Sequence, residues 1–324
     1  ILCAAFSVPR SLCRVLCVAF SVSRCTQHAD QHRYRLLWMS DYRYRYIVMI
    51  AASEIRRYTA LKLTERKHKM LKQARDLLEE GEELHQLLKT MSDTDYEKST
   101  PFKSWTINNV VGHLHVSDKM AVLSLKDPDE FKRVITSGEA GQAMTPRGAG
   151  DSLRQQWWEY FSEMCQLLGD SDPKRRVPWF GPDMGVMMFT TARQMETWSH
   201  GQDIYDLMGQ ARVNSDRLEN VAVIGVKTYG WTFANRKVDV PGPAPYVKLT
   251  APSGAVWEFN EPNSDNYIEG DAAEFCHVVT QGRNIVDVNL TVVGKPATEW
   301  MAVAQCFAGP PENPPAPGTR LINY

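Results

Sequence analysis

The feature that most constrains the fold of this chain is a change in the spacing of its apolar residues. Over residues 71–91, apolar side chains recur every three to four positions with glutamates between them, which is the pattern of an amphipathic helix. Similar runs continue to about residue 235. After the Pro-rich stretch 238–246, the spacing turns to alternation on both sides of Ser253-Gly254, which predicts a β-hairpin. The expected fold class is therefore α+β, with a helical part first and a small α+β domain after it.

Local signals place the ends of the expected helices. Thr106 and Asp151 can each accept a hydrogen bond from the free amides at the start of a helix, and Gly209 follows the last apolar residue of another. In the C-terminal part, short helices are expected over 271–280 and 297–307, around a strand region at 284–294. The expected helices of the first part are, in chain order, 71–91, 106–125, 151–168, 184–208 and 216–235.

Both ends of the chain differ in composition from its middle. Between residues 1 and 29 there is no acidic side chain, while Arg10, Arg14 and Arg24 lie among serines, alanines and short apolar runs. Such a composition resembles an organellar transit peptide, although non-native sequence is the alternative. The tail is rich in proline and is expected to be disordered or to wrap the fold. The expected division is a leader at 1–52, a helical domain at 53–236, an α+β domain at 246–311 and a tail at 312–324.

Charge and cysteine usage exclude several classes of protein. The 324 residues carry a net charge of -1, which favours neither a nucleic-acid nor a membrane-surface partner. The apolar runs are shorter than the ~20 residues that cross a bilayer. Of the seven cysteines, four lie in the first 25 residues and none forms a C-x-x-C pair, so neither a disulfide framework nor a thiolate zinc site is expected. We expect a small-molecule partner and a reducing compartment, which is the cytoplasm, or an organelle if the leader is genuine.

A polar stripe on the helix at 184–208 points to chemistry. On a wheel of ~100° per residue, Arg193, Glu196, His200 and Asp203 fall close to one line, and apolar residues flank it. A stripe bracketed in this way is expected to be buried, where a carboxylate and an imidazole need partners. Glu196 and His200 are four residues apart, which suits two ligands on one metal ion.

A third ligand is expected from the helix at 106–125, which offers His113 and His115. The two residues point in nearly opposite directions on the wheel. His113 shares its face with Val110, Val116 and Met120, whereas His115 lies with charged residues, so His113 is the one expected to face inward. Two imidazoles and one carboxylate suit Zn²⁺, and Ni²⁺, Mn²⁺ or Fe²⁺ accept the same donors.

The same residues also have plainer interpretations. Glu196 and His200 form the kind of pair that occurs on many helices, and Arg193 has either Glu196 or Asp203 within reach for a salt bridge. Asp203 follows His200 by three residues and is expected to orient it. Arg193 and Gln202 are the remaining candidates on this helix for contacts to a cofactor.

Two segments resemble a known family. STPFKSWTINNVVGHLHVSD (99–118), with a Trp eight residues before a His, is similar to the second-helix signature of DinB-like proteins, whose relatives include the mycothiol-dependent maleylpyruvate isomerases. ARQMETWSHGQDIYDLMG (192–209) resembles their ligand helix. The resemblance implies a bundle of mainly four helices over about 68–236. It also reaches about residue 311 in a branch of uncharacterised metal-binding proteins.

The family implies both ligands and chemistry. Its metal ligands fall on His113, Glu196 and His200, and its mechanism implies a low-molecular-weight thiol whose pKa the metal lowers. Two hypotheses follow: a metal-dependent, thiol-using transferase or isomerase, and a non-catalytic module that binds metal or another ligand.

The Pro-rich connection offers a first test of the expected organisation. Limited proteolysis should cut within 236–246, because an exposed connection is open to a protease while packed domains are not. Mass spectrometry of the products locates the cut. If conditions that remove the tail leave no stable fragment with that boundary, the two parts do not fold separately.

Overall fold

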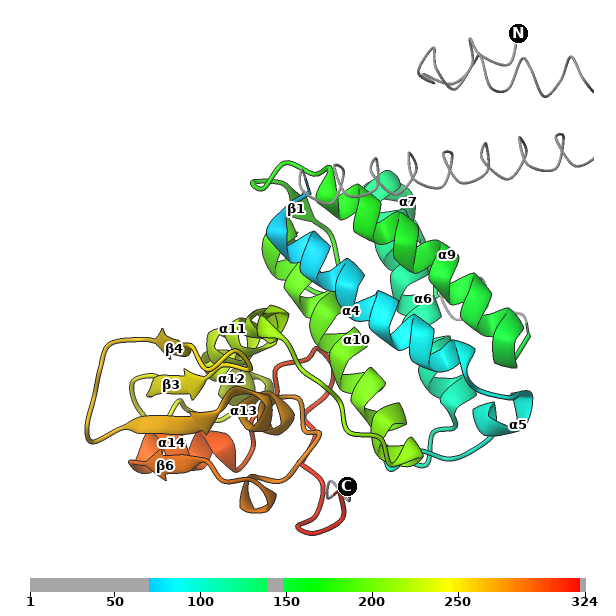
Figure 1. The fold of residues 1–324 in the computed structure, drawn as a ribbon. Helices are drawn as coiled ribbons and strands as arrows, with labels where there is room; N and C mark the ends of the chain where they lie inside the picture. Colours follow the sequence, from blue (N-terminus) through cyan, green and yellow to red (C-terminus); the bar gives the residue numbers. More distant parts are fainter. Residues whose placement is uncertain (1–69, 139–147, 321–324) are drawn as a thin grey trace, which may run out of the picture. The chain divides into compact units, whose positions relative to one another are not determined.

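The computed structural model describes residues 70–138 and 148–320 (Figure 1). The expected leader at 1–52 and the first residues of the expected helical domain, 53–69, lie outside the described residues. Within the described ranges, helices come first and a four-stranded sheet follows, so the α+β class is confirmed.

In the described residues, the first part is a bundle of packed α-helices. Its elements are α4 (Lys72–Lys89), α5 (Asp93–Tyr96), α6 (Ile107–Lys126), α7 (Pro128–Ser137), α9 (Gly150–Gly169), β1 (Arg176–Val177), β2 (Met184–Gly185) and α10 (Val186–Met208). The helix α6 packs on α9, α4 packs on both α9 and α10, and α6 also touches α10. Their inner faces form one apolar core around Leu84, Leu114 and Trp157.

The helix ends follow local chemistry, with one correction. The Thr106 hydroxyl accepts a hydrogen bond from the Asn109 amide at 3.2 Å, so the expected cap of α6 is confirmed. Asp151 does not cap α9, which begins one residue earlier, at Gly150. The Gly150 amide donates instead to the Asn108 side chain of α6 at 2.8 Å. Asp151 in the first turn accepts from the guanidinium of Arg154.

The helix expected over 216–235 is divided into three pieces. These are η2 (Asp216–Leu218), α11 (Glu219–Lys227) and α12 (Tyr229–Asn235). The hydroxyl of Thr228 donates to the carbonyl oxygens of Ile224 at 2.8 Å and Gly225 at 2.9 Å. A side chain that bonds the preceding turn competes with the backbone ladder, and the helix breaks there.

The C-terminal part is a four-stranded sheet covered by helices. Its elements are β3 (Tyr246–Thr250), β4 (Val256–Phe259), β5 (Tyr267–Asp271), α13 (Ala272–Val279), η3 (Ile285–Asp287), β6 (Thr291–Val293) and α14 (Lys295–Met301). The strand order is β4-β3-β5-β6, with β3 and β5 parallel and the other neighbours antiparallel. The hairpin around Ser253-Gly254 and the helix at 271–280 are thus confirmed. The helix expected at 297–307 lies earlier and is shorter, because Pro296 starts it and it ends at Met301.

The helix α10 is shared by two hydrophobic cores. One core fills the bundle, and the other lies between the sheet, α13, α14 and the α11–α12 pair. Phe189 and Ile204 of α10 belong to the first core, whereas Met195 and Trp198 belong to the second. In Figure 1, α10 accordingly runs between the other bundle helices and the sheet. Separate folding of the two parts stays a prediction.

The C-terminal segment returns to α10. In the described residues of the expected tail, 312–320, the carbonyl of Glu312 accepts from Gln281 at 2.8 Å, and Arg320 pairs with Asp203. This segment, red in Figure 1, therefore wraps the fold, which was the alternative to disorder. Residues 321–324 lie outside the described residues.

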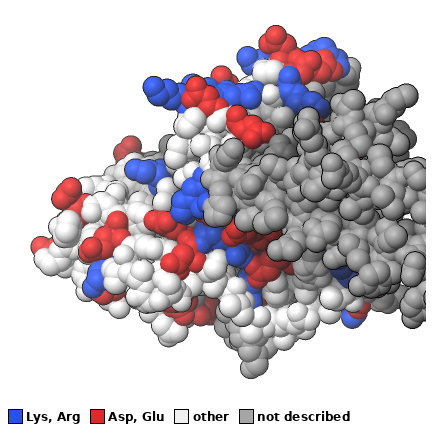
Figure 2. All heavy atoms as spheres, turned by 45° about the horizontal axis from the view of Figure 1, so that its top comes forward, with Lys and Arg blue, Asp and Glu red and all other residues white. Residues whose placement is uncertain are grey.

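The distribution of surface charge and the apolarity of the helices bear on the kind of partner that this protein binds. On the face drawn in Figure 2, acidic and basic side chains of the described residues lie interspersed. Among the helices that the structure describes, none combines the length and apolarity that a membrane span requires.

His85 of α4 is buried against α9. The side chain is 4% exposed, contacts Arg154 and meets the Trp158 ring edge-on at 4.2 Å. Burial, followed by the positive charges of Arg154 and Lys89, lowers the pKa of His85 to about 4.

The buried His85 should make stability depend on pH. The unfolded chain binds a proton near pH 6.5 and the folded chain only near 4, so the free energy of unfolding falls as pH drops between those values. Between pH 7 and pH 5, the free energy of unfolding of the native chain should fall by up to about 2 kcal/mol more than that of the His85→Gln variant. This follows from ~1.4 kcal/mol per pKa unit. Urea unfolding of both proteins at both pH values measures this difference. Equal decreases in the free energy of unfolding would contradict the prediction.

The close contact between α4 and α9 at Gly81 gives a second prediction. A Cβ at Gly81 would overlap the ring of Phe161, which is fully buried in the core. Gly81→Ala should therefore lower the free energy of unfolding by about 1–3 kcal/mol. Gly230→Ala in α12 is the matched control, because its Cβ meets nothing within 4 Å and alanine favours a helix. Equal stabilities of the two variants would show that Phe161 moves aside.

Candidate metal centre

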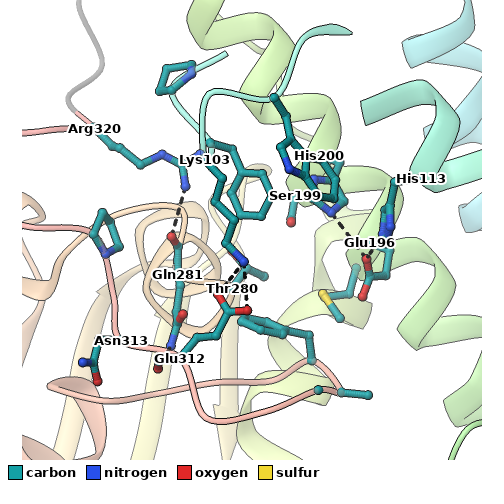
Figure 3. A pocket seen from close by; sticks show the side chains of 18 of the residues that line it. Lys103, His113, Glu196, Ser199, His200, Thr280, Gln281, Glu312, Asn313 and Arg320 are labelled. Carbon is teal, nitrogen blue, oxygen red and sulfur yellow. Dashed lines mark hydrogen bonds and ion pairs between the residues drawn. The ribbon is translucent and has the colours of Figure 1, made fainter. Parts of the chain in front are cut away.

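Three residues from two helices meet beside a cavity (Figure 3). His113 comes from the middle of α6, and Glu196 and His200 come from successive turns of α10. Helical geometry brings the latter pair to one face, and the packing of α6 on α10 supplies the third residue. Among the residues that the structure describes, these three form the cluster of His and Glu side chains whose donor atoms lie close enough together to hold one metal ion.

The three side chains aim their donor atoms at one another. The Glu196 Oε2 atom lies 3.1 Å from Nε2 of His113 and 3.6 Å from Nε2 of His200. One ligand atom from each residue lies within 4.8 Å of the other two. Ligands around a zinc ion sit ~2.0–2.2 Å from it, so small side-chain movements bring this donor set to a metal.

Glu196 and His200 are in the protonation states that a metal ion requires of its ligands. Burial alone would raise the pKa of Glu196, but the hydrogen bond with His113 and the neighbouring positive charges outweigh it and lower the pKa to about 2. Burial lowers the pKa of His200, and the Glu196 carboxylate only partly opposes this. At neutral pH, Glu196 is therefore an anion and the His200 imidazole is neutral.

Asp203 orients His200 from behind. Its Oδ2 atom lies 3.2 Å from Nδ1 of His200, and the side chain is almost fully buried. A carboxylate that accepts from Nδ1–H leaves the lone pair on Nε2, which is the atom that faces Glu196. The spacing of three residues on α10 brings Asp203 to this side of His200.

Aromatic rings enclose the histidines. The Trp105 ring stacks on His200 with a centroid separation of 5.8 Å and an angle of 14°, and Phe102 meets His200 edge-on at 5.1 Å. Both residues precede α6. They limit the rotation of the His200 ring and shield one side of the site.

The cavity beside the donors measures about 410 Å³. It reaches from His113, Glu196 and His200 to the C-terminal segment, and Figure 3 shows Lys103 and Glu312 meeting across it. The Lys103 ammonium lies 2.8 Å from both carboxylate oxygens of Glu312. The sequence did not point to this contact, because the two residues are 209 positions apart and neither lies in a periodic pattern.

The remaining candidates of α10 have partners elsewhere. The guanidinium of Arg193 bonds the buried Asp118 at 3.0 Å, rather than Glu196 or Asp203. Gln202 donates to Asp206 at 2.9 Å. Neither residue lines the cavity, so the geometry adds no support to their proposed contacts with a cofactor.

His115 lies away from the three donors. It packs edge-on against Tyr160 of α9, with ring centroids 5.4 Å apart, and only 3% of it is exposed. The two histidines of α6 therefore point to different surroundings, and His115 is buried between helices.

Comparison with known proteins gives one family model and two similar sequences. A family model described as the mycothiol maleylpyruvate isomerase N-terminal domain matches residues 77–205. Two uncharacterised proteins of Mycobacterium tuberculosis, from strains CDC 1551 / Oshkosh and H37Rv, are each 31% identical to the chain over 244 residues. These matches cover 73% of this chain and 95% of each relative.

Two solved structures were also found. A mycothiol-dependent maleylpyruvate isomerase matches 65% of this chain and 90% of its own, at 13% identity and a TM-score of 0.41. A variant of such an isomerase, with one histidine replaced by alanine, matches 71% of this chain and 97% of its own, at 13% identity and a TM-score of 0.45.

The helical bundle with its His, Glu and His cluster defines a DinB-like protein. The chain belongs to the same family as these two M. tuberculosis proteins, and within it residues 77–205 match the mycothiol maleylpyruvate isomerase N-terminal domain.

Proposed function

We propose that this protein binds one divalent metal ion, zinc first, through His113, Glu196 and His200, and that it uses the ion in a thiol-dependent transfer or isomerisation. The observation that carries the proposal is the convergence of the Nε2 atoms of both histidines on one Glu196 oxygen. Two imidazoles and one carboxylate are the ligand set of many catalytic zinc sites.

The cavity supports an open coordination position. Three protein ligands leave at least one site on a tetrahedral ion for a water or a substrate atom. The cavity of about 410 Å³ borders all three donors, so a small molecule has access to that position. A purely structural metal site would have a fourth protein ligand instead.

The chemistry that the ion would supply is the lowering of the pKa of a bound thiol, which makes a thiolate available at neutral pH. The chain's own residues would hold and orient the reactants. Burial keeps the His200 imidazole neutral, Asp203 fixes its direction through Nδ1, and Trp105 and Phe102 shield the donors from solvent. Lys103 and Ser199 give the cavity polar groups for a substrate.

Family membership supports a thiol partner. The matched domain is named for mycothiol, a low-molecular-weight thiol, and for maleylpyruvate isomerase. For this chain we propose a low-molecular-weight thiol and an electrophilic small-molecule substrate.

The metal proposal predicts a specific pattern of variants. Purified protein should hold about one zinc ion per chain, and His113→Ala, Glu196→Ala and His200→Ala should each reduce it to a small fraction, because each removes a ligand. His115→Ala is the control: it costs stability, since the residue is buried, but should keep the metal content per folded chain. Elemental analysis of folded protein measures the content.

Two outcomes would contradict the proposal. If gently purified protein has no metal and zinc does not raise its melting temperature, the three residues form only a buried hydrogen-bond network. If zinc binds but no low-molecular-weight thiol shifts the melting temperature of the zinc-loaded protein more than that of the metal-free protein, the non-catalytic binding module is the better description.

A further inference from the structure

Two buried ion pairs join α10 to the C-terminal part of the chain. Asp203 pairs with Arg320, and Asp206, one turn further along, pairs with Arg283 at 2.8 Å. All four side chains are at most 8% exposed. The pairs therefore resemble each other in burial, in charge and in the helix that they use.

The two pairs differ in what lies next to the aspartate. Both carboxylate oxygens of Asp203 have partners. Oδ1 accepts a hydrogen bond from the Arg320 guanidinium, and Oδ2 lies 3.2 Å from Nδ1 of His200. Asp206 instead accepts from Gln202 and Arg283 on one oxygen, while its other oxygen has no hydrogen-bond partner. Of the two pairs, the one between Asp203 and Arg320 contacts a residue of the candidate metal centre, which is His200.

Arg320 has a second route to the same imidazole. Its guanidinium lies 5.7 Å from the centroid of the Phe102 ring, and that ring meets His200 edge-on at 5.1 Å. It also donates to the Gln281 carbonyl at 3.2 Å, which ties it to the residues after α13 (Figure 3). Arg320 is thus held on three sides between α10, the loop before α6 and the C-terminal part.

From these contacts we infer that Arg320 is a positioning residue of the metal centre, acting on His200 through Asp203. The inference rests on the proposed metal-binding function. The guanidinium occupies Oδ1 of Asp203 and compensates its buried charge, which leaves Oδ2 fixed toward Nδ1–H of His200. Without Arg320, the carboxylate is buried without a counter-charge, and turning away from its present orientation lowers its free energy.

The consequence for His200 concerns the site of its proton. An Asp203 that no longer accepts from Nδ1–H allows the proton to sit on Nε2, the nitrogen that faces Glu196. That tautomer presents an N–H bond instead of a lone pair to a metal. The C-terminal segment, which is 117 positions from Asp203, would in this way set the metal affinity of a site on α6 and α10.

The test is a double-mutant cycle on metal affinity. Zinc dissociation constants are measured by chelator competition for the native chain, Asp203→Asn, Arg320→Met and the double variant. Arg320→Met should weaken zinc binding by about tenfold or more, the range seen when groups that support metal ligands are removed. The double variant should bind no more weakly than the weaker single variant, because both changes break one chain of contacts.

Arg283→Met is the matched control. It removes the other buried arginine and leaves Asp206 without its counter-charge, so its cost to folding resembles that of Arg320→Met. Its zinc affinity should stay at the native value. Equal losses of affinity in the two arginine variants, or additive losses in the cycle, would overturn the inference. If Arg320→Met does not fold, the double variant, in which no charge is left alone, must bind zinc as Asp203→Asn does.

A metal-free measurement separates this inference from the metal proposal. In protein labelled with ¹⁵N-histidine, the imidazole shifts of His200 report which nitrogen carries the proton. The native chain should show the Nδ1–H form, and Arg320→Met a mixture. A changed tautomer in a protein that binds no zinc refutes the proposed function but keeps the positioning role, whereas an unchanged tautomer refutes the role.

Discussion

The structure depends on the burial of a polar helix. On α10, Arg193, His200 and Asp203 are each less than 9% exposed, and the helix has a hydrophobic core on two sides. Each buried charge costs several kcal/mol unless another charge or hydrogen bond compensates it. The partners therefore come from several elements. On α6, Asp118 pairs with Arg193 and His113 pairs with Glu196. Arg320 of the C-terminal segment pairs with Asp203. The arrangement of the other elements around α10 satisfies these requirements.

The candidate metal centre lies where these requirements meet. Two helices of the bundle supply His113 and the Glu196–His200 pair, while the loop at 101–105 and the C-terminal segment line other parts of the cavity. The three donor side chains come from helices, whereas much of the cavity wall comes from segments outside the long helices, so different parts of the chain set the donor geometry and the shape of the cavity.

Much of the fold was predictable because its signals are local. The Thr106 cap, the end of α10 at Gly209 and the hairpin at Ser253-Gly254 each depend on a few adjacent residues. The errors arose where a distant or competing group decided the outcome. The amide of Gly150 bonds Asn108 on another helix, and the Thr228 hydroxyl bonds the preceding turn, so α9 begins early and the helix after residue 216 breaks.

The sequence by itself determined the pairing of Glu196 with His200, the position of Asp203 behind them and the choice of His113 over His115, because helical spacing fixes which side chains share a face. Only the tertiary structure decided that Arg193 bonds Asp118, that Arg320 bonds Asp203 and that Lys103 meets Glu312. These contacts join residues 75, 117 and 209 positions apart. No periodicity relates residues at such separations, and their approach is set by the packing of whole elements and by the need of each buried charge for a partner.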